Sequence, residues 1–252
     1  MNKIAVLVSG GLDSFVAYHS AVREVGKENV FAIHVDLGQP YAEKERIAIE
    51  KSNIKCINVE CKILGTVLPE LKDEDWIIPG RNLLLVCLAS MKAPIVYLSA
   101  LGTETTYESR SHDKSERFYE DISKLLTYVM DYEYKSDVIV RTPFESMSKT
   151  TMIEYALKVL NLTKEQLCST SSCYDSTRYF CGKCVACFNR WVAMSNNGIQ
   201  EPYENDPWKF KYSLDTFENV KKAVGENDYS HYSKIRVYEI LEAYKKVGMY
   251  HE

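Results

Sequence analysis

The sequence predicts an α/β fold in which a parallel sheet carries helices on both faces, followed by a C-terminal helical region of different character. Strand-like apolar runs alternate with helix-compatible segments over residues 1–165, and the first run stops at a glycine pair. Four cysteines crowd into the chain after the alternation has ended. Alternation of this kind builds βαβ units with right-handed crossovers and a buried parallel sheet. We therefore place a domain boundary between residues 165 and 166, with the second region covering 166–252.

The individual elements follow from hydrophobic periodicity and from turn residues. The expected strands are Ile4–Val8, Val30–Val35, Lys55–Val59, Ile95–Leu101 and Val138–Val140. The expected helices are Phe15–Val25, Ala42–Lys51, Asn82–Met91, Ser115–Tyr132 and Met147–Leu160. Near the end of the chain, an apolar stripe with helical spacing predicts an amphipathic helix within Tyr229–Lys246, formed by Val237, Ile240, Leu241 and Tyr244.

Composition and charge narrow the class of protein. The 252 residues are 46% hydrophobic and 26% charged, which is typical of a folded globular chain and excludes a disordered one. The formal net charge of −4 gives no basic footprint for nucleic acid, so a small-molecule substrate is expected. The most apolar stretch, 83–101, is broken by Lys92 and Pro94, and the apolar run before Ser9 is shorter than a signal peptide needs. We expect a cytoplasmic protein without a membrane partner.

The segment Ser9-Gly10-Gly11-Leu12-Asp13-Ser14 lies between the first strand and the first helix, where open α/β sheets place ligands. Two glycines allow a sharp turn that presents N–H groups to an anion, and the helix N-terminus adds its positive end. The Ser9 and Ser14 hydroxyls can donate to phosphate oxygens, and Asp13 is a candidate Mg²⁺ ligand. The alternative is a plain strand-to-helix turn in which Asp13 caps the helix.

The hexapeptide resembles the pyrophosphate loop of the PP-loop ATPases, which adenylate a substrate and release pyrophosphate. It lacks the lysine of a Walker A loop and the glycine pattern of a dinucleotide fold. The resemblance implies that ATP is surrounded by residues of the loop and the first helix. These are Val8, Ser9, Gly10, Gly11, Leu12, Asp13, Ser14, Phe15 and Tyr18.

Cys173, Cys181, Cys184 and Cys187 have the spacing C-x7-C-x2-C-x2-C. Four thiolates at this spacing suit the tetrahedral geometry of a closed structural Zn²⁺ site. An iron–sulfur cluster is the main alternative and disulfides are a more distant one, although an intracellular environment keeps thiols reduced. The remaining cysteines are expected to be reduced, partly buried thiols; they are Cys56, Cys61, Cys87 and Cys168.

Together these motifs resemble the 7-cyano-7-deazaguanine synthase family, PP-loop enzymes that make the nitrile precursor of queuosine. The matching segments besides the loop are Gly38-Gln39, Pro79-Gly80-Arg81-Asn82, Thr142-Pro143, Ser148-Lys149, Thr170–Tyr174 and Cys181–Arg190. The resemblance implies catalytic roles for Asp13, Ser14, Arg81 and Lys149, and substrate-binding roles for Gln39, Asn82 and Asp113. It also implies ATP, Mg²⁺ and Zn²⁺ as cofactors and a homodimer as the assembly.

The chain departs from the family pattern where substrate would be recognised. Ser111-His112-Asp113-Lys114-Ser115 stands where the family has aromatic-Pro-Asp-Cys-Arg, so that only the aspartate is kept. Ser171 replaces a tryptophan, and Pro40-Tyr41 replaces an Arg-His pair. Nucleotide activation is therefore better supported than the identity of the product.

The expected reaction is adenylation of 7-carboxy-7-deazaguanine, attack by ammonia and conversion of the amide to the nitrile. The first alternative is a divergent paralogue that stops at the amide or joins the activated acid to an amine of a macromolecule. The second is a PP-loop tRNA thiolase, which needs a catalytic cysteine outside the four-cysteine cluster. The third is a zinc-containing binding module without ATP turnover.

Overall fold

The computed structural model describes residues 3–64, 66–67, 78, 80–102, 112–173, 175 and 180–250. Pro79, Ser111 and Tyr174, which belong to the segments of the family resemblance, lie outside the described residues. The strands are β1 (Ile4–Leu7), β2 (Val30–Asp36), β3 (Cys56–Glu60), β4 (Ile95–Tyr97) and β5 (Ile139–Arg141). The α-helices are α1 (Leu12–Val25), α2 (Ala42–Lys51), α3 (Arg81–Ser90), α5 (Glu116–Tyr134), α6 (Lys149–Lys158), α7 (Lys164–Cys168), α8 (Val185–Asn196), α9 (Lys211–Glu226) and α10 (Lys234–Lys246). Short 3₁₀ turns cover Lys27–Asn29 and His112–Lys114.

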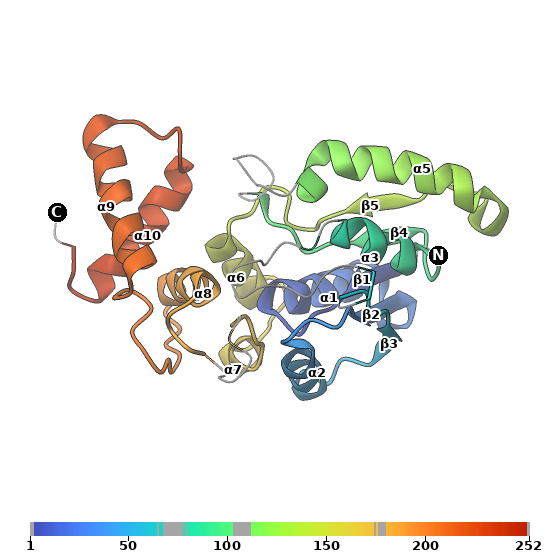
Figure 1. The fold of residues 1–252 in the computed structure, drawn as a ribbon, viewed down its shortest axis with the longest axis horizontal. Coiled ribbons are helices and arrows are strands. Elements are labelled where there is room, and N and C mark those ends of the chain that lie inside the picture. The colour runs from blue at the N-terminus through green and yellow to red at the C-terminus, as the bar shows by residue number, and fades with distance from the viewer. Residues whose placement is uncertain are drawn as a thin grey trace.

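The described strands form one parallel sheet in the order β3-β2-β1-β4-β5 (Figure 1). Ile4 in β1 pairs with Val30 on one side and with Ile95 on the other. The chain moves outward from β1 to β2 and β3, and then crosses back to β4. The strand order thus reverses between β1 and β4, and such a switch point is where open α/β sheets bind ligands.

Helices cover both faces of the sheet, which confirms the predicted fold class. Ile4 and Val6 of β1 face a core formed with α1 and α6, whereas Ala5 and Leu7 face a second core formed with α3 and α5. In Figure 1 the green α5 and the blue α1 lie on opposite sides of the strands. The alternation of side chains along β1 explains why both faces of this central strand are buried.

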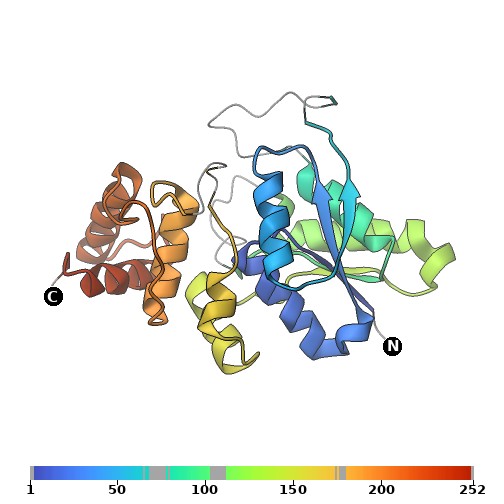
Figure 2. The ribbon, with the colours of Figure 1, turned by 90° about the horizontal axis from the view of Figure 1, so that it is seen from below.

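The C-terminal helices α8, α9 and α10 share a third core and stand as an orange-to-red group beside the sheet (Figure 2). The stripe expected in the last helix is at most 3% exposed, at Val237, Ile240, Leu241 and Tyr244. This helix begins at Lys234 rather than near Tyr229, because the Ser233 side chain accepts a hydrogen bond from Arg236 N and caps it. In the described part of the chain, no helix has both the length and the apolar character of a membrane span.

Two element boundaries differ from expectation in a way that matters for the site. The expected strand over 95–101 ends at Tyr97, and Leu98, Ser99 and Ala100, which follow it, line a cavity. The expected helix over 147–160 begins instead at Lys149, because Ser148 and Thr151 form a reciprocal capping box. This capping box fixes Lys149 as the first residue of α6.

Candidate functional site

The glycine-rich segment after β1 packs tightly against α2. Gly10 has φ of 71°, and a Cβ atom at this position would lie 2.7 Å from the Glu45 carbonyl oxygen and 2.8 Å from Ala48 Cβ. The Ser9 amide donates to Ser14 Oγ at 3.1 Å, and Ser14 Oγ lies 3.1 Å from the Gly11 carbonyl oxygen, to which it can donate. The loop is therefore closed on the first turn of α1, and glycine is required at residue 10 for conformation and for space.

Replacing Gly10 by alanine tests this packing. We expect Gly10→Ala to lower the free energy of unfolding by about 3 kcal/mol, because it adds a contact with backbone atoms to the cost of a positive φ. Urea denaturation measures the change. Gly198→Ala is the matched control, since Gly198 has φ of 66° but open space around its Cβ position. Equal losses in the two variants would show that packing against α2 does not matter.

Asp13, in the first turn of α1, forms an ion pair with Lys149, the first residue of α6. Lys149 Nζ lies 2.8 Å from Asp13 Oδ2, and both side chains are mostly buried. The other carboxylate oxygen, Asp13 Oδ1, is buried and has no hydrogen-bond partner among the described residues. Because a buried carboxylate oxygen without a partner is costly, this atom suits coordination to a hard cation such as Mg²⁺.

A cavity of about 340 Å³ opens at the switch point between β1 and β4. It brings together most of the residues expected to bind nucleotide or substrate: Val8, Ser9, Gly11, Leu12, Asp13, Ser14, Gln39, Arg81, Asn82 and Lys149. Leu98, Ser99 and Ala100, which follow β4, line it from the other side. The loop over residues 9–14, called the phosphate loop below, thus lines one space together with Arg81 and Lys149.

Four of the expected site residues do not line this cavity. Phe15 and Tyr18 belong to α1, and their side chains are buried in the core. Gly10 is the loop residue that packs against α2. Asp113 sits behind Asn82, whose backbone amide donates to Asp113 Oδ2 at 3.4 Å and whose side-chain amide donates to the Asp113 carbonyl at 3.2 Å. Asp113 is therefore placed to orient Asn82.

The structure adds residues to the cavity wall that sequence reasoning did not assign to the site, including His34, Tyr41, Lys44 and Glu45. His34 Nδ1 lies 3.1 Å from the Val8 carbonyl oxygen, so this nitrogen carries the proton and donates. Burial lowers the pKa of His34, which keeps the ring neutral at physiological pH. His34 lies near the carboxyl end of β2, and this position in the sequence could have indicated that it belongs to the site.

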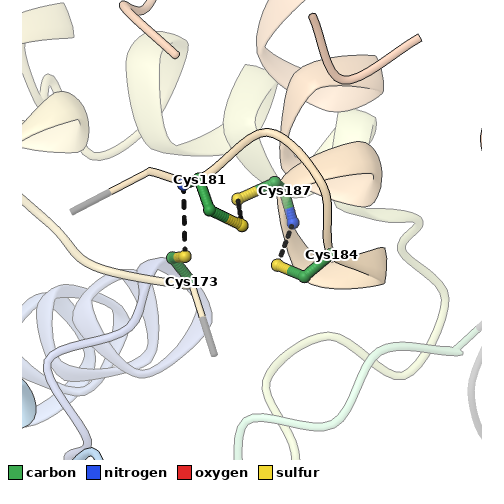
Figure 3. Close-up of side chains that lie close together, drawn as sticks. All are labelled: Cys173, Cys181, Cys184 and Cys187. Carbon is green, nitrogen blue, oxygen red and sulfur yellow. Dashed lines mark hydrogen bonds between the residues drawn. The ribbon is translucent and has the colours of Figure 1, made fainter. Parts of the chain in front are cut away.

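The four clustered cysteines converge on one point (Figure 3). Their sulfur atoms all lie within 4.8 Å of one another, and Cys181 Sγ is 4.0 Å from Cys187 Sγ. A tetrahedral zinc site with Zn–S bonds of about 2.3 Å requires sulfur atoms about 3.8 Å apart. The donor set and its spacing therefore fit zinc.

Backbone geometry and charge support the same assignment. Amides of Cys181, Lys183 and Cys187 donate to the sulfurs of Cys173, Cys181 and Cys184 at 3.3–3.4 Å. Hydrogen bonds with the neighbouring Cys173 and Cys184 raise the pKa of Cys187, and burial raises that of Cys181 to about 11. Hydrogen bonds from Cys184 and Cys187 lower the pKa of Cys173. A divalent metal would allow all four to ionise.

Arg190 connects this cluster to the phosphate loop. Its guanidinium is fully buried and donates to Glu201 at 2.6 and 2.8 Å. It also donates to Thr170 Oγ1 at 2.9 Å and to Ser172 Oγ at 3.1 Å. Ser171 lies between Thr170 and Ser172 in the sequence, and its amide donates to the Gly10 carbonyl at 2.9 Å. Arg190 therefore holds the segment that carries both Cys173 and the contact to the loop.

The cysteines outside the cluster are half-buried and form no disulfides in the described part of the chain. Burial raises the pKa of Cys56 and of Cys168 to about 11, and it also raises the pKa of Cys87. Thiols in such surroundings remain protonated near neutral pH, whereas a thiolase nucleophile must be a thiolate. This weakens the thiolase alternative.

Comparison with known proteins places the chain in a family. The family model described as "Queuosine biosynthesis protein QueC" matches residues 68–198, just over half of the chain. The chain belongs to the QueC family. The matched segment contains Arg81, Asn82, Lys149 and the four clustered cysteines.

Individual relatives of this QueC family member are distant. The 7-cyano-7-deazaguanine synthase of Sulfolobus acidocaldarius is 27% identical over 228 residues, which cover 80% of this chain and only 47% of that protein. The 7-cyano-7-deazaguanine synthase 1 of Colwellia psychrerythraea is 26% identical over 225 residues, covering 79% of this chain and 97% of that protein. A solved NH3-dependent NAD synthetase from Campylobacter jejuni aligns with a TM-score of 0.40 and 15% identity, too remote to add to the argument.

Proposed function

We propose that the protein is an ATP-dependent ligase that adenylates 7-carboxy-7-deazaguanine and uses ammonia to form 7-cyano-7-deazaguanine. The observation that carries this proposal is the cavity in which the phosphate loop, Arg81 and the Asp13–Lys149 pair meet, in a member of the QueC family. An adenylating enzyme needs alignment of two substrates, and positive groups that balance the charge developing on pyrophosphate, more than it needs a protein nucleophile.

In the proposed reaction, the substrate carboxylate attacks the α-phosphorus of ATP while the bond to pyrophosphate breaks. The N–H groups of the loop and the α1 N-terminus hold the phosphates, and Arg81 and Lys149 balance the charge that develops on the leaving group. Asp13 would hold Mg²⁺, which neutralises phosphate charge when bound. Ammonia then displaces AMP to give the amide. A second adenylation at the amide oxygen and the departure of AMP with that oxygen leave the nitrile.

A second candidate is a reaction that ends at the amide or at a conjugate with an amine of a macromolecule. It is favoured by the altered substrate segment: Lys114 lines the cavity where the family pattern has a cysteine, and Ser171 replaces a tryptophan beside the loop. The expected cytoplasmic location and homodimer remain predictions. A zinc site of four cysteines requires reduced thiols, which is why a cytoplasmic location is expected, and sedimentation velocity would check the homodimer.

Product analysis tests the proposed function. Purified protein incubated with 7-carboxy-7-deazaguanine, Mg-ATP and ammonium is expected to release pyrophosphate and to yield the nitrile by mass spectrometry. We expect Asp13→Asn to lower kcat/KM by roughly 10²-fold to 10³-fold, because one cation ligand and the partner of Lys149 are lost. Asp121→Asn, at an exposed position on α5, is the control. An amide that is never dehydrated would favour the second candidate, and no pyrophosphate would exclude both.

A further inference from the structure

Glu45 on α2 lines the same cavity, beside the phosphate loop. Its backbone carbonyl is the atom against which Gly10 packs, so the residue is fixed against that loop. The Gln39 side-chain amide donates to Glu45 Oε2 at 2.8 Å. Gln39 is itself buried, and its Oε1 accepts a hydrogen bond from the Leu37 amide at 2.9 Å. This hydrogen bond orients the Gln39 amide so that its nitrogen faces Glu45.

The second carboxylate oxygen, Glu45 Oε1, has no hydrogen-bond partner among the described residues. Glu45 also has no ion-pair partner there, in contrast to Asp13, the other acidic residue of the cavity wall. One oxygen is therefore oriented by Gln39, and the other remains for a ligand. A ligand at this atom must bring a hydrogen-bond donor.

The charges around Glu45 make it able to accept a proton. The pKa of Glu45 is raised to about 7, mainly by loss of hydration and to a smaller extent by the charge of Asp36, while the Gln39 hydrogen bond and the charge of Arg81 lower it. Besides Arg81, the other titratable groups on the cavity wall are Asp13, His34, Tyr41, Lys44, Lys114, Tyr119, Lys149 and Cys173. A carboxylate with a pKa close to the working pH is suited to general base catalysis.

The proposed reaction requires such a base. Ammonia is mostly present as ammonium at neutral pH, and ammonium has no lone pair with which to attack an acyl adenylate. A positive ion must also be held in a cavity that contains Arg81 and Lys149, so it needs a negative group of its own. Asp13 is already paired with Lys149, which leaves Glu45.

We infer that Glu45, oriented by Gln39, is the ammonium-binding residue and the general base that releases ammonia beside the acyl adenylate. This inference rests on the proposed function. Ammonium donates to Glu45 Oε1 and transfers one proton to it, forming neutral ammonia and a carboxylic acid. The nitrogen lone pair then forms the C–N bond, the C–O bond to AMP breaks, and the nitrogen loses its extra proton to the departing phosphate or to water.

Two amines distinguish a base from a structural residue. Hydroxylamine is neutral near pH 7 and attacks without deprotonation, whereas ammonium does not. We expect Glu45→Gln to lower kcat/KM for ammonium by roughly 10²-fold while the hydroxylamine reaction changes by less than about threefold. Glu43→Gln, on the same helix with its side chain 66% exposed, is the matched control and should leave both reactions unchanged.

Adenylation is followed separately by exchange of labelled pyrophosphate into ATP in the presence of the acid and without any amine. Glu45→Gln should retain this exchange. If exchange falls and the KM of the acid rises, the carboxylate recognises the deazaguanine ring, and the inference is wrong. Equal losses with both amines, or no loss with either, would also overturn it. Absence of exchange in the wild-type protein would instead contradict the proposed function.

The wild-type protein gives an independent measurement in case the variant does not fold. With Glu45 as the base, kcat/KM for total ammonium should rise up to about pH 7 and then stay level from about pH 7.5 to 8.5. An enzyme that captures free ammonia from solution would instead show about a tenfold rise per pH unit over that interval. A level profile supports the inference, and a continuous rise contradicts it.

Discussion

Replacing Cys187 by serine is expected to release zinc and to unfold the segment that joins the phosphate loop to α8. Cys187 is fully buried, and its sulfur lies 4.0 Å from that of Cys181. Serine fits this space but replaces a thiolate donor with an alcohol that does not ionise near neutral pH. Structural zinc contributes about 10–16 kcal/mol in small zinc domains. Because α8 also packs in an apolar core with α9 and α10, we expect a smaller loss, on the order of 5 kcal/mol.

Metal content and thermal unfolding measure this effect together. The wild-type protein should carry one zinc ion per chain and should lose it to a strong chelator with a large fall in Tm, whereas Cys187→Ser should be purified without zinc. Cys61→Ser is the control, because Cys61 is a half-buried thiol outside the cluster. Full zinc occupancy in Cys187→Ser, or iron in place of zinc in the wild-type protein, would show that the ligand assignment is wrong.

The second large effect is expected at Arg190. Replacing Arg190 by methionine leaves the Glu201 carboxylate buried without its cation, since the two side chains are 0% and 1% exposed. Breaking one side of a buried ion pair typically costs about 3–5 kcal/mol. We expect Arg190→Met to lower the free energy of unfolding by about that amount, as measured by urea denaturation.

A double variant separates the buried charge from lost packing. Arg190→Met combined with Glu201→Gln should recover part of the loss, because the unpaired carboxylate is removed. Arg117→Met is the control at an ion pair whose arginine side chain is 90% exposed, and it should change stability by less than about 1 kcal/mol. If the double variant is as unstable as the single one, the uncompensated charge is not the cause.

Local motifs of this chain could be predicted from the sequence because their geometry is set by neighbouring residues. The phosphate loop is one short segment between a strand and a helix, and the cysteine spacing places three of four ligands within seven residues. Apolar residues at helical spacing predicted most of the helices that cover the sheet. The region 166–252 was predicted to be helical as a whole, but α7, α8 and α9 were not predicted individually. α7 is only five residues long, and the segments of α8 and α9 follow the end of the expected alternation and are rich in cysteine, aromatic and polar residues.

The contributions of Glu45 and Arg190 could not be predicted, because both depend on contacts between distant segments. Glu45 reads as one more charge on an amphipathic surface helix until Gly10 is seen to pack against its backbone. The sequence indicates only in part that Arg190 is buried, because it is a charged residue within an apolar stretch. Its partner Glu201 lies in a loop that carries no motif, so the pair emerges only from the fold.

The hydrogen bond from the Ser171 amide to the Gly10 carbonyl joins two sites that are about 160 residues apart in sequence. When a ligand orders the loop at Gly10, the free-energy cost of ordering the segment at Ser171 falls, and the reverse also holds. Thermodynamic reciprocity then requires that a nucleotide bound at the loop raise the affinity of the cysteine cluster for its metal by the same factor by which the metal raises the affinity of the loop for the nucleotide. With zinc and ATP as the two ligands, the supply of each would change the apparent affinity for the other.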